Sequence, residues 1–277
     1  MRLLTLLRAE LLKVFGQKGT YAGYGVLLVL VTLVVWATWR YGPPFEQSMR
    51  RDRDLIITGK LVAGTTIARY MMEPSMFVLV PLLVCTVSGG LFAAEMQRGT
   101  MRALLCRPVR RVALAISKYV AGWVHAISLT AFLGLFSLAL GYAVFGRGEL
   151  VLYRDGLTIL TEPMALLRLG QGYAYCALCM CAVASLAVLL SQLVDNPLTA
   201  SAVALAVLLV GGVVGQIEYF EWLRPYLLVT HLDDFSMLFG SQVDYGPLRW
   251  PIGCLFAYML VPFGLGLILF HRQDIKC

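Results

Sequence analysis

The sequence of 277 residues is 59% hydrophobic and only 14% charged, with a mean hydropathy of +0.77. Soluble domains hold about 45–50% apolar and about 25% charged residues, so this chain has too few charges to cover a water-exposed surface. Composition therefore excludes a soluble, disordered, collagen-like or nucleic-acid-binding chain, and the net charge of +7 has to be interpreted by where the basic residues lie. The sequence predicts a protein that spans a bilayer.

The first element predicted is an amphipathic helix over residues 2–15, lying in the membrane interface. Its apolar and polar residues fall on opposite sides of a helix. The apolar stripe consists of Leu3, Leu4, Leu7, Leu11, Val14 and Phe15, and the polar side of Arg2, Thr5, Arg8 and Lys13. Gly16 and Gly19 then let the chain turn into the bilayer. A frayed cytosolic tail is the alternative.

Six apolar stretches are each long enough to cross about 30 Å of hydrocarbon, which takes about 20 helical residues. They are predicted at residues 21–39, 74–94, 112–144, 173–193, 198–216 and 251–270. No repeat or low-complexity linker divides the chain, so residues 1–277 are interpreted as one transmembrane domain. The predicted fold class is an all-α integral membrane protein with six transmembrane helices preceded by an N-terminal amphipathic interfacial helix.

The distribution of basic residues predicts the orientation of these spans. Six crossings place both termini on one side, together with the connections at residues 95–111 and 194–197. Lys and Arg are denser near the span ends on that side, which indicates that it is cytoplasmic. The cluster of Arg50, Arg51 and Arg53 on the opposite side is an exception, and its role stays open.

The search for catalytic and metal-binding patterns is mostly negative. The sequence has no G-x-x-x-x-G-K-[ST] loop, so the chain does not hydrolyse nucleotide by that route. Cys176, Cys179 and Cys181 have the spacing of metal ligands, but no second cluster completes a set, so we interpret them as packing residues and predict no metal site. His125 lies inside the third span, where a polar residue is a candidate for the transport pathway or is bonded within the packing.

The connection between the second and third spans, residues 95–111, is the most informative segment. The second span ends at Glu95, Gly99 breaks the helix, Thr100 can cap a new short helix, and Pro108 stops that helix. The segment also carries five arginines, among them Arg107 and Arg111, and the apolar pair Leu104–Leu105. Such a basic piece fits the groove of a soluble partner, with the leucines as anchor and the arginines as rim. A basic loop that only fixes the topology is the alternative.

The order of residues here resembles the signature of permease subunits of ABC-2 type transporters, in which it lies between the second and third membrane helices. The matching residues are Glu95, Gly99, Thr100, Leu104, Leu105, Pro108, Arg111 and Lys118. The sequence Leu-Arg-Ala-Glu-Leu-Leu-Lys at residues 7–13 and the six-span layout are similar as well.

The resemblance implies a pair of membrane subunits, as a homodimer or with a related chain, joined to two separate ATP-binding subunits. The segment from Glu95 to Arg111 would be the coupling element that the ATPase grips. ATP and Mg would belong to the partner chain, and no cofactor is expected in this one. The implied location is the plasma (inner) membrane of a prokaryote, multi-pass, with both termini cytoplasmic and with membrane lipids as further partners.

Three further features follow from the same layout. Asp195 and Asn196 would be a second, smaller cytoplasmic contact in the family, although both also suit a plain turn and helix cap. Gly211 and Gly215 allow a close helix approach, either between subunits or within the chain. The apolar, aromatic segment 217–249 predicts short helices in the outer membrane interface.

The first functional hypothesis is a permease subunit, expected to export an amphipathic substrate, driven by a separately encoded ATP-binding subunit. A membrane anchor or assembly factor that recruits an ATPase without moving a substrate is one alternative. A lipid-modifying membrane enzyme is another, although the carboxylates are dispersed and no catalytic residue is predicted. The substrate, the direction of transport and the pairing of permeases stay open.

Overall fold

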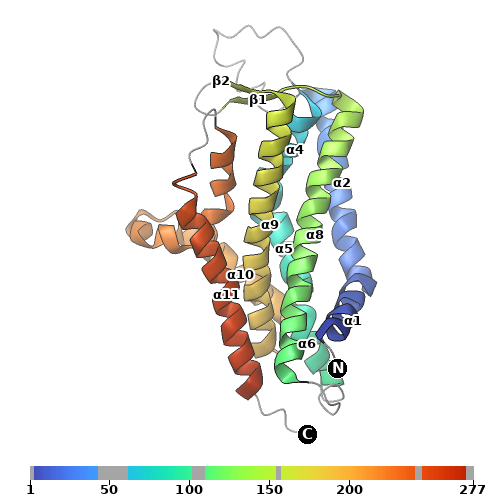
Figure 1. Cartoon of the computed structure of the whole chain (residues 1–277), viewed down its shortest axis with the longest axis vertical. Helices are drawn as coiled ribbons and strands as arrows, with labels where there is room; N and C mark the ends of the chain where they lie inside the picture. Colours follow the sequence, from blue (N-terminus) through green and yellow to red (C-terminus); the bar gives the residue numbers. More distant parts are fainter. Residues whose placement is uncertain (1–2, 43–61, 102–109, 154–156, 241–244, 273–277) are drawn as a thin grey trace.

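The computed structural model describes residues 3–42, 62–101, 110–153, 157–240 and 245–272. These residues form a bundle of α-helices with both chain ends at the same end of the bundle (Figure 1). Six helices of the described part are long and apolar enough to cross a membrane, which confirms the predicted fold class. They are Lys18–Tyr41 (α2), Gly64–Gln97 (α4 to α6), Arg111–Phe145 (α8), Glu162–Leu193 (α9), Pro197–Val214 (α10) and Arg249–Arg272 (α11).

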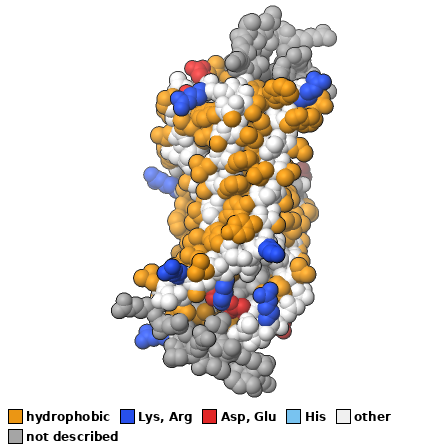
Figure 2. All heavy atoms as spheres, turned by 90° about the vertical axis from the view of Figure 1, so that its right-hand side faces the viewer, with side chains coloured by type: hydrophobic (Ala, Val, Ile, Leu, Met, Phe, Trp, Pro, Cys, Tyr) orange, Lys and Arg blue, Asp and Glu red, His pale blue; other side chains and the backbone are white. Residues whose placement is uncertain are grey.

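The surface of the bundle supports a membrane-spanning arrangement. Figure 2 shows one face on which hydrophobic side chains cover the middle, while Lys and Arg side chains gather mostly toward the two ends. Such an apolar band between charged ends suits a bilayer, where charges are costly in the hydrocarbon region. The chain is therefore a multi-pass membrane protein.

The N-terminal helix α1 spans Leu3–Gly16 and ends where the sequence predicts a turn. Gln17 leaves the helical conformation, and the hydroxyl of Thr20 in α2 donates to the carbonyl oxygen of Val14 at 2.6 Å. The side of α1 that packs into the protein carries Leu6, Glu10 and Val14, at a spacing of four residues. Residue 2 lies outside the described part, and the location of α1 in the interface stays a prediction.

The second span is a composite of four consecutive helical segments. It runs through α4 (Gly64–Pro74), a π-helical turn (Ser75–Leu79), α5 (Val80–Ser88) and α6 (Gly90–Gln97). This helix begins at Gly64, not at residue 74 as predicted. The polar residues of its first turns, such as Thr65 and Arg69, are buried against other helices, which a hydropathy pattern cannot foresee. The fourth span likewise begins at Glu162 instead of residue 173.

The end of the bundle away from the termini carries elements that interrupt the helical pattern. A short antiparallel hairpin pairs β1 (Leu150–Tyr153) with β2 (Leu157–Leu160), and the sequence pattern did not predict it. Short helices are predicted at residues 217–249, and the described residues up to 240 contain 3-10 turns: η2 (Glu218–Tyr226), η3 (Thr230–Leu232) and η4 (Asp234–Phe239). Part of this segment projects sideways from the bundle in Figure 1.

The buried side chains form two hydrophobic cores. The larger one lies among α2, α4, α5, α8 and α9 and includes the three cysteines of α9, Cys176, Cys179 and Cys181. Their burial supports the interpretation as packing residues. The smaller core lies nearer the termini and joins α1, α6, α8 and α11 through residues such as Val14, Phe92 and Phe270. The candidate site described next borders this smaller core.

Candidate functional site

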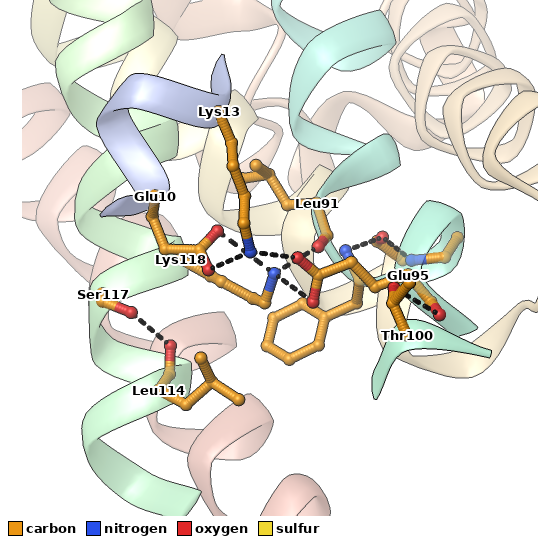
Figure 3. Close-up of polar contacts among 11 residues, drawn as sticks. Glu10, Lys13, Leu91, Glu95, Thr100, Leu114, Ser117 and Lys118 are labelled. Atoms are coloured by element: carbon orange, nitrogen blue, oxygen red, sulfur yellow. Dashed lines mark hydrogen bonds and ion pairs between the residues drawn. The ribbon is translucent and has the colours of Figure 1, made fainter. Parts of the chain in front are cut away.

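Two lysines and two glutamates from three separate segments meet at the end of the bundle that holds both termini (Figure 3). At its centre is Lys118 of α8, whose side chain is completely buried. The ammonium group donates to the carbonyl oxygen of Leu91 at 2.7 Å and lies 3.3 Å from Glu10 Oε2 and 2.8 Å from Glu95 Oε2. The contact with Glu95 is an ion pair without the alignment of a hydrogen bond.

Lys13 of α1 contacts the other carboxylate oxygen of each glutamate. Its ammonium group lies 3.0 Å from Glu10 Oε1 and 2.8 Å from Glu95 Oε1. Each carboxylate oxygen of the two glutamates therefore has an ammonium partner, and the four charges sum to zero. We call Glu10, Lys13, Glu95 and Lys118 the ion-pair cluster.

The elements that carry the cluster are held by local features of the sequence. In α6, the backbone N–H groups of Phe92 and Ala93 donate to the hydroxyl of Ser191 on α9, at 3.0 and 2.9 Å. This anchor fixes α6 so that Glu95, one turn later, points toward α1 and α8. The ring of Phe92 also lies 5.3 Å from the Lys118 ammonium, within the range of a cation–π contact.

The surrounding charges favour the charged form of Lys13. Burial lowers the pKa of Lys13, but the hydrogen bond to Glu95 and the charges of Glu10 and Glu95 outweigh burial and raise this pKa above its usual value. The charge of Lys13 is thus favoured in the folded protein. Because the pKa is raised, this contribution to stability is present at neutral pH and is lost only as strongly alkaline pH passes the folded-state pKa.

The predicted coupling segment begins directly beside the cluster. The α6 helix ends at Gln97, and Gly99 has a positive φ of 70°, so the helix break at this glycine is confirmed. The chain returns to helical conformation at Thr100, whose hydroxyl donates to the Glu95 carbonyl oxygen at 3.3 Å. The predicted contact residues Leu104, Leu105, Arg107 and Pro108 lie outside the described residues.

A cavity of about 810 Å³ lies next to the cluster. Its wall includes Lys13, Glu95, Arg98 and Thr100, and also Pro197, the first residue of α10. The turn that carries Asp195 and Asn196 therefore reaches the same cavity as the coupling segment. The described start of the coupling segment and the residue that follows this turn therefore border one cavity.

The remaining predicted residues are placed as follows. Arg111 is the first residue of α8, and Asn196 caps α10 by accepting the backbone N–H of Leu198 at 2.9 Å, while Asp195 is exposed. His125 is buried in α8, 6.4 Å from the rings of both Phe15 and Tyr24. It takes no part in the ion-pair cluster.

Gly211 and Gly215 pack within the chain. A methyl group built on Gly211 would meet the side chain of Val229 at 3.4 Å, and one on Gly215 would meet Leu227 at the same distance. The close approach allowed by these glycines is therefore made to the external segment. Whether they also contact a second subunit stays a prediction.

Two residues of the cluster, Glu10 and Lys13, were not predicted as site residues. The sequence spacing could have identified Glu10, because it lies four residues from both Leu6 and Val14 and therefore falls on the buried side of α1. A carboxylate on a buried helical face requires a cationic partner. What the sequence could not show is that this partner comes from residue 118, 108 residues away in the chain.

The ion-pair cluster links three helices through charged side chains. Each lysine contacts both glutamates, and each glutamate contacts both lysines. Within the described residues, no group of three or more His, Cys, Asp and Glu side chains has the arrangement of a metal site. The ion pairs of the cluster connect α1, α6 and α8.

Comparison with known proteins places the chain in a family. One protein similar to it is the "Uncharacterized protein YhcI" of Bacillus subtilis (strain 168), which is 25% identical over 222 residues, covering 76% of this chain and 70% of that protein. A family model described as "Protein of unknown function (DUF2705)" matches residues 55–276. Since this match covers most of the chain, including α4 to α11, the protein belongs to the DUF2705 family.

Proposed function

We propose that this chain is the permease subunit of an ATP-driven transporter of the ABC-2 type, whose ATP-binding subunit is a separate protein. The observation that carries the proposal is the ion-pair cluster. Glu95 and Lys118 belong to the signature that the chain resembles, and Glu10 and Lys13 belong to the second similar segment, at residues 7–13. Ion pairs thus connect the signature residues with the similar segment at residues 7–13, which is distant from them in the sequence.

The geometry suits transmission of a movement. The cluster joins α1, the end of the second span and the start of the third span, directly beside the turn at Gly99. A force applied to the coupling segment would move these three elements as one body, because a buried, fully paired charge network resists separation. Rigid-body motion of this kind is a common basis for switching between conformations.

The predicted coupling residues differ in exposure, and this difference suggests two roles. Lys118 is completely buried, so it cannot contact a partner subunit and would act by positioning Glu95 and α1. Arg98 and Thr100 are exposed at the turn, and Arg110 is exposed directly before α8, so these described residues are suited to direct contact. The coupling element would therefore consist of an exposed contact surface and a buried joint behind it.

In this proposal the end with both termini faces the cytoplasm of a prokaryotic cell. ATP and Mg would be bound by the partner subunits, and two permease chains would surround the transport path. Closure of the ATP-binding subunits would push the coupling segments and change the side to which the path opens. We propose export of an amphipathic substrate.

The proposal is tested by purifying the full-length, tagged chain from its native membrane and identifying the subunits that remain bound. We expect an ATP-binding protein with a phosphate-binding loop and an ATP hydrolysis activity that co-purifies. The variants Glu95→Ala and Arg111→Glu should be inserted in the membrane but should lose this ATP hydrolysis. Arg249→Glu, at the first residue of α11, is the matched control and should retain it.

Two outcomes would contradict the proposal. One is that no ATP-binding protein co-purifies with the wild-type chain. The other is that Glu95→Ala and Arg111→Glu retain full coupling. A passive anchor differs in a third measurement, because after reconstitution into vesicles it would support ATP hydrolysis without movement of any amphipathic test substrate.

A further inference from the structure

A second and larger cavity, of about 1510 Å³, lies toward the hairpin end of the molecule. Its wall is formed by α4 with the π-helical turn, the β1–β2 hairpin, the end of α10 and the 3-10 segment. Binding sites for small molecules usually measure about 300–1,000 Å³, so this cavity has room for a headgroup together with part of an apolar chain. None of its lining residues belongs to the ion-pair cluster.

The buried cationic residue of the wall is Arg69 of α4, which is only 8% exposed. Its guanidinium lies 5.2 Å from the ring of Phe235 and 4.7 Å from the ring of Phe239, and its Nη2 donates to Glu73 Oε1 at 2.8 Å. Its Nε is buried without a hydrogen-bond partner among the described residues. A buried N–H group of a charged side chain is costly to leave unbonded, so this edge of Arg69 is suited to an acidic ligand group.

The anionic part of the wall includes the carboxylates of Glu73, Asp233 and Asp234. Arg69 contacts one oxygen of Glu73, whose side chain is 54% exposed. Asp234 contacts the ring nitrogen Nδ1 of His231 through its Oδ2 at 2.8 Å. Asp233 and Arg224 also line the cavity, so side chains of both signs border the same space.

Apolar residues and the surrounding segments indicate where the cavity lies relative to a bilayer. Phe77, Val229 and Met237 add an apolar side to the wall. The neighbouring η2 segment exposes Tyr219 and Trp222, at 84% and 69%, and such aromatic residues favour the headgroup level of a membrane. The wall also contains the π-helical turn, and such turns occur frequently at functional sites, which supports a binding role for the cavity.

We propose that this cavity binds the headgroup of a zwitterionic amphiphile, which carries an acidic group and an ammonium group close together. The acidic group is held by Arg69 and Arg224, and the ammonium group by Glu73 and Asp234. The apolar part lies against Phe77 and the side chains near it. A purely acidic ligand would face the carboxylates, and a purely cationic one would face the guanidinium groups.

The inference names the substrate class of the proposed transporter and in that sense rests on the proposed function. Binding can nevertheless be measured without an ATP-binding subunit, so the two proposals fail separately. A bound ATPase without headgroup selectivity would overturn only the present inference. Headgroup selectivity without an ATPase would overturn only the transporter.

The first experiment measures lipid binding to the full-length chain in detergent by native mass spectrometry. The probes are dioleoyl phosphatidylethanolamine, dioleoyl phosphatidylglycerol and dioleoylglycerol at equal concentration. We expect the zwitterionic lipid to bind about tenfold better than the other two, as suits one charge-assisted hydrogen bond. In Glu73→Gln the preference over the acidic lipid should fall severalfold, and in Arg224→Gln the preference over the uncharged lipid should fall.

Matched controls and a peptide probe make the test decisive. Glu218→Gln and Arg249→Gln change exposed charges outside the cavity wall and should leave the preference unchanged. A second arm compares an amphipathic hexapeptide with free termini against the same peptide with acetylated and amidated ends. Selective binding of the zwitterionic lipid or of the free peptide supports the inference and identifies the source of the ligand. Equal binding of all probes, or equal effects of cavity and control variants, would overturn it.

Discussion

The two ends of this protein use the same types of charged residue in opposite ways. At the end with the termini, every carboxylate oxygen of Glu10 and Glu95 contacts an ammonium group, and Lys118 has no exposed surface. At the hairpin end, Glu73 is paired through one oxygen and is half exposed beside a large cavity. We call the first arrangement closed because every carboxylate oxygen has an ammonium partner, and the second open because only one oxygen of Glu73 is paired.

The difference indicates what each end can do. A neutral cluster centred on a buried lysine holds its elements together, because separating a pair would leave a charge uncompensated. An open pair has unused hydrogen-bonding capacity that a ligand can satisfy. We therefore assign rigidity to the first end and recognition to the second, and the following substitutions test this contrast.

The largest effect is expected for Lys118→Met. This substitution leaves the carboxylates of Glu10 and Glu95 with only Lys13, and breaking a buried ion pair by removing one partner costs about 3–5 kcal/mol. The measurement is the free energy of unfolding, or the unfolding temperature, of the chain in detergent.

A double substitution provides the control for this loss. Lys118→Met together with Glu10→Met leaves one lysine and one glutamate, so the charges balance again. We expect the double variant to recover a large part of the lost stability. If it is no more stable than Lys118→Met alone, the cluster is not held by charge balance.

A smaller loss is expected for Ser191→Ala, which leaves the cluster residues unchanged but removes the hydroxyl that accepts from the N–H groups of Phe92 and Ala93. Unpaired buried N–H groups cost about 1–3 kcal/mol, and α6 should become less well anchored. Hydrogen exchange at Phe92 and Ala93 should become faster. Unchanged exchange at both amides would show that α6 is fixed by packing alone.

The smallest effect on stability is expected at the open end. Arg224→Gln changes an exposed side chain of the cavity wall, and surface substitutions away from buried networks usually change stability by less than about 0.5 kcal/mol. Its effect should appear in ligand binding and not in unfolding. A loss of stability comparable with that of Lys118→Met would remove the contrast between the two ends.

The sequence predicted the six spans because each contains a long apolar run, which lipid contact requires. It missed the first turns of α4, since the polar residues there, such as Arg69, are buried within the protein and not in contact with lipid. Hydropathy cannot distinguish these two environments. The sequence also missed the first turns of α9, which begins at Glu162. The hairpin was missed for a different reason, because its strands of four residues are too short for a periodic signal.

The candidate site was predicted only in part. Glu95 and Lys118 were singled out because of a resemblance, and the helix break at Gly99 followed from the residue type. Their contact with Glu10 and Lys13 depends on how α1 packs against α6 and α8, which no local pattern contains. The open cavity could not be predicted at all, because its residues come from four segments that are distant in the sequence.

The most direct test of the coupling role is cysteine cross-linking in native membranes. Cysteine is placed at the exposed position Arg98, with Arg249→Cys as the control at the first residue of α11, and Cys254, Cys106 and Cys277 replaced by serine. We predict that the Arg98→Cys chain is cross-linked to an ATP-binding subunit and is labelled by a membrane-impermeant maleimide only after cells are opened. Labelling of this position in intact cells, or no cross-link to an ATP-binding protein, would contradict the account.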